Sequence, residues 1–419
     1  MKNACEHKPS GIGLIRQWAC ASLLAAMIFP VSASQAMGPT AQEADFLARH
    51  WPGDTIPPQG PPPRDYSPLE ASLSAADCGA CHPRQYEDWQ TSLHSRAMGP
   101  GVAGQTVDMR ADDPASARMC WRCHAPLAEQ QPLLQRPADG AWVENPAFDA
   151  DLQHQGLTCA ACHVRSHRRF GPPAQGESES SAHAGFSPQT AFGKSAFCAH
   201  CHQFPPGEYA LNGKLMENTY NEWLASDYAR QGVQCQDCHM PDRRHLWRGI
   251  HDPEMVKKAV TISVVGAQNP HKVGDTLEAT IRVLNSGTGH NFPTYVTPKV
   301  FVRAQLLDAG GEAVAGSLRE AIIGRETTPD LSREIYDTRI APGDFVDIVY
   351  VHPLSRPGLR LQIEVRVEPD HFYERFYRGL LENGTPQKGR AAIEQALVNA
   401  QQSSFVIFEQ TLSLDIQPQ

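Results

Sequence analysis

Ten of the twelve cysteines fall into five copies of one pattern, in which two cysteines separated by two residues are followed at once by histidine. In chain order, the five motifs are Cys78-Gly-Ala-Cys81-His82, Cys120-Trp-Arg-Cys123-His124, Cys159-Ala-Ala-Cys162-His163, Cys198-Ala-His-Cys201-His202 and Cys235-Gln-Asp-Cys238-His239. This pattern is typical of c-type haem attachment. Each sulfur adds across a haem vinyl group to form a thioether, and the following histidine binds the iron as its proximal ligand. We therefore expect all ten cysteines to attach haem and all five motif histidines to bind iron.

Three other uses of paired cysteines are considered. Zinc sites use such pairs but do not need a histidine after each one. Thioredoxin-like redox motifs occur singly, in a βαβ context. Five disulfides in an exported protein are the third alternative. Haem attachment is favoured because five complete motifs use every cysteine beyond residue 36.

The motifs are evenly spaced along the chain. They begin at residues 78, 120, 159, 198 and 235, so the gaps are 42, 39, 39 and 37 residues. Such spacing predicts repeated haem-binding units. The predicted cofactor is five covalently attached haem c groups, with their iron. Because they share residues 78–239, we expect the haems to lie close together and to form the core of this region.

A second axial ligand for each iron must come from elsewhere in the chain. Beyond His7 and the motif histidines, 12 histidines remain. The preferred candidates as further metal ligands are His94, His245, His251 and His290. His94 follows a predicted helix, and His245 and His251 follow the last motif. His290 lies in a Gly-rich turn whose glycines would let the backbone approach a partner closely.

Other ligands stay open as alternatives. They are His154, His167 and His183, together with Met98, Met216 and Met240. Methionine ligation would raise the reduction potential relative to a pair of histidines. With so many histidines available, we expect mostly bis-histidine haems of low potential. His50 and His200 are expected to face solvent.

The first 36 residues have the features of a secretory signal peptide. Basic residues precede the uncharged, mostly apolar run 18–31, and small residues lead to a cleavage site after Ala36. An uncleaved anchor is the alternative. Cleavage would remove a segment of net charge +2 and change the net charge from −9 to −11. The sequence thus predicts a periplasmic or extracellular bacterial protein, and its negative charge argues against nucleic-acid binding.

Composition and hydrophobic patterning divide the rest of the chain. We expect a Pro-rich extended segment at residues 37–77, a pentahaem cytochrome domain at 78–258 and a β-sandwich domain at 259–419. The predicted fold class is α+β: a mainly helical and loop haem domain followed by an antiparallel, immunoglobulin-like sandwich. Predicted strands are 260–264, 277–284, 300–307, 345–351, 359–367 and 405–416. A late helix is predicted at 388–402.

Two helices can be predicted next to the motifs. One begins at Pro83, which suits a first helical position, and carries Tyr86 and Trp89 on one face. The other begins at a capping box formed by Thr219 and Glu222 and ends near Gly232.

Several of these segments together resemble the multihaem cytochrome c superfamily that includes cytochrome c-554, hydroxylamine oxidoreductase and pentahaem nitrite reductase. The segments that carry the resemblance are Cys78–His82 with Trp89-x-x-Ser92-x-His94, Cys235–Pro241 with His245 and Gly249-Ile-His251, and Gly289-His290-Asn-Phe-Pro293-Thr. The resemblance covers roughly residues 75–300, and the sandwich is similar to domains appended to some family members. It implies haem pairs in parallel or perpendicular contact, which serve as electron carriers or surround a catalytic haem. Pentahaem nitrite reductases carry one motif that ends in lysine, whereas all five motifs here end in histidine.

Three functions are compared. The first is electron transfer along mostly bis-histidine haems between redox partner proteins, with a membrane-bound electron-transfer complex as one candidate partner. The second is a reductase or oxidase of nitrite, hydroxylamine or sulfite that acts at one five-coordinate haem. The third is a structural role in which the sandwich docks the cytochrome to a partner. Electron transfer is preferred, and no catalytic residue is assigned.

Overall fold

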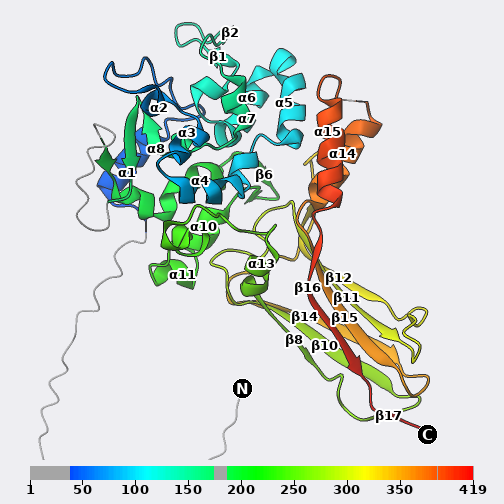
Figure 1. Ribbon diagram of the computed structural model, residues 1–419. Helices are drawn as coiled ribbons and strands as arrows, with labels where there is room; N and C mark the ends of the chain where they lie inside the picture. Colours follow the sequence, from blue (N-terminus) through cyan, green and yellow to red (C-terminus); the bar gives the residue numbers. More distant parts are fainter. Residues whose placement is uncertain (1–37, 174–185, 385, 419) are drawn as a thin grey trace, which may run out of the picture. The chain divides into compact units, whose positions relative to one another are not determined.

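The computed structural model describes residues 38–173, 186–384 and 386–418 (Figure 1). Ala36–Gln419 form one compact unit. The predicted signal peptide and His183 lie outside the described residues, and the predicted domain boundaries stay predictions. No described helix is long and apolar enough to cross a membrane.

Up to Ala259 the chain consists of short helices joined by loops (Figure 1). The helices are α1 (Ala41–His50), α2 (Pro68–Ala71), α3 (Ala75–Gly79), α4 (Pro83–Gln90), α5 (Pro100–Asp112), α6 (Pro114–His124), α7 (Ala150–His154), α8 (Cys159–His163), α9 (Ala199–His202), α10 (Thr219–Leu224), α11 (Asp227–Arg230), α12 (Cys235–His239) and α13 (Pro253–Ala259). The 3-10 turns are η1 (His94–Arg96), η2 (Ala128–Gln130), η3 (Thr190–Gly193), η4 (Ser195–Phe197) and η5 (Pro241–Arg243). The short strands are β1 (Leu133–Gln135), β2 (Trp142–Glu144), β3 (Val164–Arg165), β4 (Arg168–Gly171), β5 (Ser187–Pro188), β6 (Ala210–Leu211) and β7 (Lys214–Leu215).

Some local predictions in this region are confirmed and others are wrong. Helix α4 begins at Pro83, as predicted, because a proline at the first helical position loses no hydrogen bond. The predicted capping box is wrong: Thr219 is already the first residue of α10, and Asn218 precedes it. Helix α1 was not predicted, although Thr40 and Glu43 form a capping box at its start. His50, at its end, is only 2% exposed rather than in solvent, since its ring stacks on Phe46.

From Val260 onward the chain is mostly antiparallel sheet. The strands are β8 (Val260–Val265), β9 (His271–Lys272), β10 (Thr276–Asn285), β11 (Lys299–Leu307), β12 (Arg319–Thr327), β13 (Glu334–Asp337), β14 (Phe345–Pro353), β15 (Arg360–Glu368), β16 (Phe405–Ser413) and β17 (Ile416–Gln417). They form a three-stranded sheet in the order β14-β10-β8 and a five-stranded sheet in the order β13-β12-β11-β15-β16. All six predicted strands are present, and β9, β12, β13 and β17 are additional. The predicted α+β fold class, with an antiparallel C-terminal part, is confirmed.

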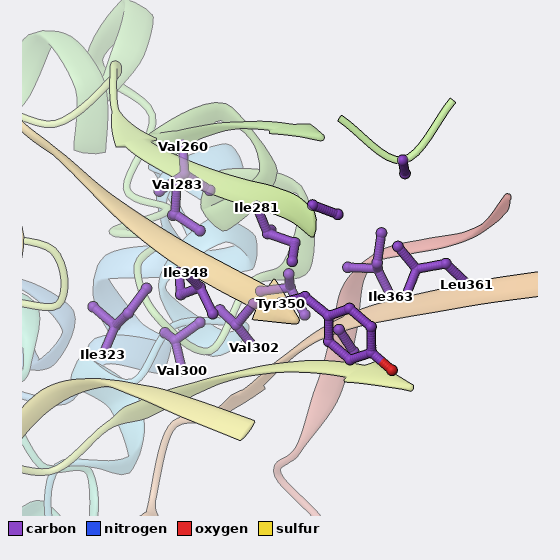
Figure 2. Packing of buried hydrophobic residues seen from close by; sticks show 14 of the residues in the cluster. Val260, Ile281, Val283, Val300, Val302, Ile323, Ile348, Tyr350, Leu361 and Ile363 are labelled. Atoms are coloured by element: carbon purple, nitrogen blue, oxygen red, sulfur yellow. The ribbon is translucent and has the colours of Figure 1, made fainter. Parts of the chain in front are cut away.

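The two sheets share one hydrophobic core (Figure 2). Alternate residues of each strand point into it, because successive side chains of a strand project to opposite faces. On β15 these are Leu361, Ile363, Val365 and Val367, which are completely buried. On β10 they include Ile281, which lies near Val302 and Ile348 in Figure 2. The alternation that predicts the strands therefore also predicts which of their residues form the core.

A helical hairpin is inserted between β15 and β16. It consists of α14 (His371–Glu382) and α15 (Arg390–Gln401), and α15 packs against α5 (Figure 1). Helix α15 confirms the prediction for 388–402, whereas α14 was missed. The turn before α15 is held by Asp108 of α5, whose carboxylate accepts hydrogen bonds from the backbone of Gln387, Lys388 and Gly389.

Substitution of Ile281 by alanine should lower the free energy of unfolding by about 2–5 kcal/mol, because it removes a fully buried side chain and leaves a cavity. Val351 of the same sheet is 55% exposed, so Val351→Ala should change stability by less than about 0.5 kcal/mol. Denaturant unfolding followed by circular dichroism measures both variants. Equal effects of the two substitutions would contradict the assignment of the core.

Candidate functional site

Each cysteine motif occupies one turn of helix. Helices α6, α8, α9 and α12 all end at the motif histidine, and in the first motif His82 donates its backbone N–H to the carbonyl of Cys78. The two cysteines and the histidine therefore stand at positions i, i+3 and i+4, which share one face of a helix. This placement aims two nucleophilic sulfurs and one imidazole at the same volume, as attachment and ligation of one haem require.

Thiols of different motifs contact one another. Cys78 is hydrogen-bonded to Cys159, Cys123 to Cys201, and Cys198 to Cys235. The first motif is thus adjacent to the third, the second to the fourth, and the fourth to the fifth.

Three motif histidines face a second histidine from outside the motifs. His202 faces His94, with ring centres 6.4 Å apart. His163 faces His245 at 6.2 Å. His239 faces His290 at 6.4 Å, and the planes of these rings differ by only 16°. Three of the four candidates for a second ligand, His94, His245 and His290, are therefore brought to motif histidines.

These distances fit a metal ion between the rings. A metal–nitrogen bond is about 2 Å long, and the centre of an imidazole lies about 1 Å beyond its nitrogen, so two axial imidazoles of one metal stand about 6 Å apart. The donor set and its spacing therefore fit haem iron.

Hydrogen bonds at Nδ1 hold the motif rings in place. Nδ1 of His124 lies 2.6 Å from the carbonyl of Ala97, and Nδ1 of His163 lies 2.7 Å from that of Phe170. Nδ1 of His239 lies 2.6 Å from the carbonyl of Arg248. A carbonyl can only accept, so these contacts make Nδ1 the donor and leave the lone pair of Nε2 for a metal.

Burial keeps these rings neutral, which is the ligand form of histidine. It lowers the pKa of His94 to about 3, and the pKa values of His163 and His202 to about 4 each. It also lowers the pKa values of His245 and His290.

His251, the fourth candidate ligand, has a different partner. Its Nε2 lies 3.1 Å from Oδ2 of Asp370, and within the described residues its ring contacts no motif histidine. The prediction that His251 binds iron stays a prediction, and the Asp370 contact argues against it.

Asp88 positions the segment that carries His245. Its carboxylate is 4% exposed and accepts hydrogen bonds from the guanidinium of Arg244 and, at 2.9 Å, from the backbone N–H of His245. The segment needs this anchor because Asp242, Arg243 and Trp247 have positive φ angles, which are costly for residues other than glycine.

A loop between β10 and β11 carries His290. The side chain of Asn285 donates hydrogen bonds to the carbonyls of His290 and Ile340 at 3.0 Å each. A Cβ atom on Gly287 would lie 2.0 Å from the carbonyl oxygen of Lys258, so only glycine permits this approach. The predicted need for glycine in this turn is confirmed.

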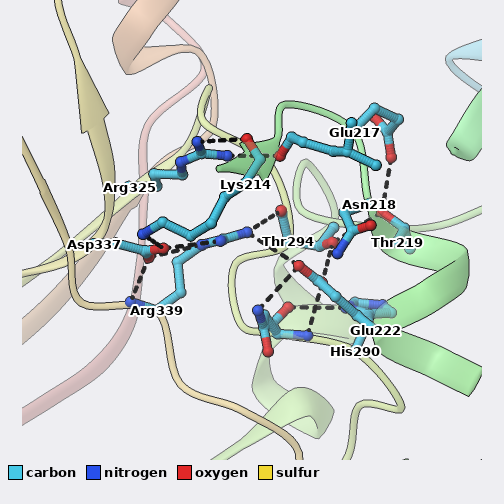
Figure 3. Close-up of polar contacts among 12 residues, drawn as sticks. Lys214, Glu217, Asn218, Thr219, Glu222, His290, Thr294, Arg325, Asp337 and Arg339 are labelled. Carbon is cyan, nitrogen blue, oxygen red and sulfur yellow. Dashed lines mark hydrogen bonds and ion pairs between the residues drawn. The ribbon is translucent and has the colours of Figure 1, made fainter. Parts of the chain in front are cut away.

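Salt bridges hold the same loop against α10 (Figure 3). Glu222 of α10 accepts hydrogen bonds from Asn291, from Thr294 and from Arg339. This is why Glu222 does not form the predicted capping box. Arg339 also pairs with Asp337, which pairs in turn with Lys214.

One contact of the site has no signal in the sequence. Nδ1 of His202 lies 2.8 Å from the phenol oxygen of Tyr295, where the other three histidines have a carbonyl. Tyr295 is 93 residues away in the chain. The contact forms because Tyr295 lies on the same loop as His290, and the fold brings this loop to the fourth motif.

Comparison with known proteins identifies the class of this site. Residues 77–164, which include the first three motifs, match the family described as cytochrome c554 and c-prime. The fold is similar to that of a penta-heme cytochrome c552 from Thermochromatium tepidum, which is 16% identical. The similarity covers 83% of this chain and 100% of that chain, with a TM-score of 0.56. The chain is therefore similar to multihaem cytochromes c in its fold and, over residues 77–164, in its sequence.

Other comparisons add nothing to this assignment. A structural-genomics target known as SoR45 and the ApaA protein from Bordetella pertussis each match 37% of the chain. Their identities are 12% and 14%, over 87% and 93% of their own chains. Their TM-scores of 0.18 and 0.17 are too low to indicate a shared fold. No curated protein matches the chain.

The matched family supports covalently attached haem c and an electron-transfer role for this protein. Redox partner proteins follow from that role in general terms.

Substitution of Asp88 by asparagine should release the segment that carries His245, because the amide loses the charge-assisted bonds to Arg244, each worth about 1.5–3 kcal/mol. Amide hydrogen exchange of residues 242–248 should accelerate at least about tenfold, since 1.4 kcal/mol corresponds to that factor. Glu87→Asn, at an exposed neighbour, should leave exchange unchanged.

The same contact makes a prediction about pH. The bond from Arg244 holds the pKa of Asp88 below its ordinary value, against the effect of burial. A lowered pKa in the folded state means that this stabilisation is complete above the ordinary carboxyl range and is lost as the pH falls through the lower value. Unchanged acid stability in Asp88→Asn would contradict this account.

Proposed function

We propose that this protein is an exported pentahaem cytochrome c that passes electrons along closely packed haems between redox partners. The observation that carries the proposal is the set of three facing histidine pairs, each with one motif histidine. Five haems would be attached at Cys78/Cys81, Cys120/Cys123, Cys159/Cys162, Cys198/Cys201 and Cys235/Cys238. The proximal ligands would be His82, His124, His163, His202 and His239.

The facing pairs support an assignment of second ligands. His245 would complete the haem of the third motif, His94 that of the fourth and His290 that of the fifth. In these three haems both axial ligands would be imidazoles, which favours a low reduction potential.

The thiol contacts support an order for electron transfer. Thioether sulfurs lie at the edge of a haem, so motifs whose sulfurs touch bring haem edges into contact. This links haem one to three, two to four, and four to five. The third and fourth are linked as well, because Cys162 is close enough to raise the pKa values of Cys198 and Cys201. Electrons could then run from haem one through three to four, and leave by haem two or five.

The partners would be proteins with basic docking surfaces. Net charge is −9, or −11 after removal of the predicted signal peptide, and each haem would add two propionates. Opposite charge speeds encounter and makes association rates sensitive to salt. Export to the periplasm or beyond rests on residues 1–36 and on the family, whose haem is attached outside the cytoplasm.

A second function is kept as an alternative: reduction or oxidation of nitrite, hydroxylamine or sulfite at one five-coordinate haem. Among the described residues, no imidazole faces His124. The haem of the second motif is therefore where we expect an open position for a small substrate.

Substitution of His290 by alanine should convert one haem from low spin to high spin, about one fifth of the total, because its iron loses an axial imidazole. Magnetic resonance or magnetic circular dichroism spectra of the purified holoprotein count the two forms. His251→Ala is the matched control and should leave the count unchanged, since His251 is bonded to Asp370. The assignment fails if His251→Ala, and not His290→Ala, creates the high-spin haem.

Carbon monoxide separates the two functions. In the reduced wild-type protein an open iron would bind about one carbon monoxide per five haems, whereas electron transfer alone predicts none. Mass spectrometry of the same sample should find five haems per chain. Fewer haems would overturn the proposed function, and carbon monoxide binding with turnover of nitrite, hydroxylamine or sulfite would favour the enzyme.

A further inference from the structure

Among His124, His163, His202 and His239, His202 is the one whose Nδ1 partner is a side chain. The phenol of Tyr295 lies 2.8 Å away, whereas His124, His163 and His239 bond to backbone carbonyls. A carbonyl oxygen can only accept a hydrogen bond. A phenol can accept one hydrogen bond and donate another to a further group. The environment of His202 can therefore change with the protonation of groups beyond Tyr295.

A continuous chain of hydroxyl groups connects Tyr295 to two carboxyl groups. Tyr295 is hydrogen-bonded to Thr219. Oγ1 of Thr219 lies 2.8 Å from Oε1 of Glu217 and 2.8 Å from Oγ1 of Thr294. Oγ1 of Thr294 lies 2.7 Å from Oε2 of Glu222. Figure 3 shows Glu217 and Glu222 with the threonines between them.

The number of protons in this chain indicates which glutamate holds one. Glu222 also accepts hydrogen bonds from Asn291 and Arg339, so Glu222 is the ionised member of the pair. Thr294 therefore donates its hydroxyl proton to Glu222. Thr294 then has no proton left for Thr219, which must donate to Thr294. The Thr219–Glu217 contact therefore needs a proton on Glu217, because each hydroxyl donates only once.

The charges around Glu217 agree with this count. Burial raises the pKa of Glu217 to about 8, the charge of Glu222 adds to the effect, and the hydrogen bond with Thr219 acts against it. Tyr295 and Tyr373 are the other titratable groups that face it. In the described part of the chain, no lysine or arginine is bonded to Glu217. Burial raises the pKa of Glu222 as well, but Thr294, Arg339 and Asn291 oppose that rise, whereas Glu217 has no bonded cation among the described residues.

We propose that Glu217 takes up one proton from water when the iron bound by His202 is reduced by one electron, and releases the proton when that iron is oxidised. The electron comes from a neighbouring haem, so charge near His202 is balanced in both states. The added electron disfavours a carboxylate nearby, and a neutral Glu217 relieves that repulsion. This inference rests on the proposed function. It places proton-linked control at the fourth motif, whose thiols contact both the second and the fifth.

The test is a redox titration of the purified holoprotein at pH values on both sides of 8, the pKa given above for Glu217. One midpoint potential should fall by up to about 59 mV for each tenfold drop in proton concentration, the value for one proton per electron. In Glu217→Gln this dependence should disappear, and the potential should stay at the value that the wild type has at low pH. In Glu217→Asp, which keeps a carboxyl group, the dependence should return at a shifted pH.

Glu254→Gln is the control for loss of one negative charge, because Glu254 is an exposed residue paired with Lys257. This variant should keep the pH dependence of the midpoint potential that the wild type shows. A wild type without a pH-dependent potential near pH 8, or the same dependence in Glu217→Gln, would overturn the inference. Haem content and the number of low-spin haems are measured on the same samples. A wrong haem number would count against the proposed function, whereas a missing pH dependence with the expected haems would count against the inference alone.

Discussion

The distance between facing imidazole rings is the constraint on which this structure depends. His163, His202 and His239 each stand just over 6 Å from a second ring, a separation that suits an iron atom between the two imidazoles. Buried imidazoles without a partner would be costly. Each ring must therefore be held within a few tenths of an ångström by its own supports. The carbonyl contacts at Nδ1 and the anchors at Asp88 and Asn285 provide them.

The C-terminal sheets contribute directly to this constraint. One loop between β10 and β11 carries both His290 and Tyr295, and it is fixed by Glu222 and Arg339. A rigid sandwich core below the loop limits its movement. We infer that the sandwich is a structural part of the site at the fourth and fifth motifs. This differs from a sandwich that only docks the cytochrome to a partner.

Several elements could be predicted from local patterns, and others could not. Strand alternation predicts β10 and β15 because one face of each strand meets the core. The prediction of a capping box at Thr219 is wrong because the Glu222 carboxylate binds Arg339 and Asn291 instead of the backbone N–H at the start of the helix. Helix α14 was missed although its aromatic residues recur at helical spacing. His50 was expected in solvent, but the aromatic rings that bury it come from distant segments.

The sequence by itself determined the five candidate positions of haem attachment. Two sulfurs and a histidine within five residues need only one helical turn to act together, so spacing alone is informative. It also identified His94, His245 and His290 as candidates, because they lie next to a predicted helix, the last motif and a Gly-rich turn. Only the tertiary structure decided which motif each of them faces, and that Tyr295 and Glu217 lie behind His202. The three histidine pairings and the contact of His202 with Tyr295 join residues that are 51 to 108 positions apart, and no local pattern encodes such contacts.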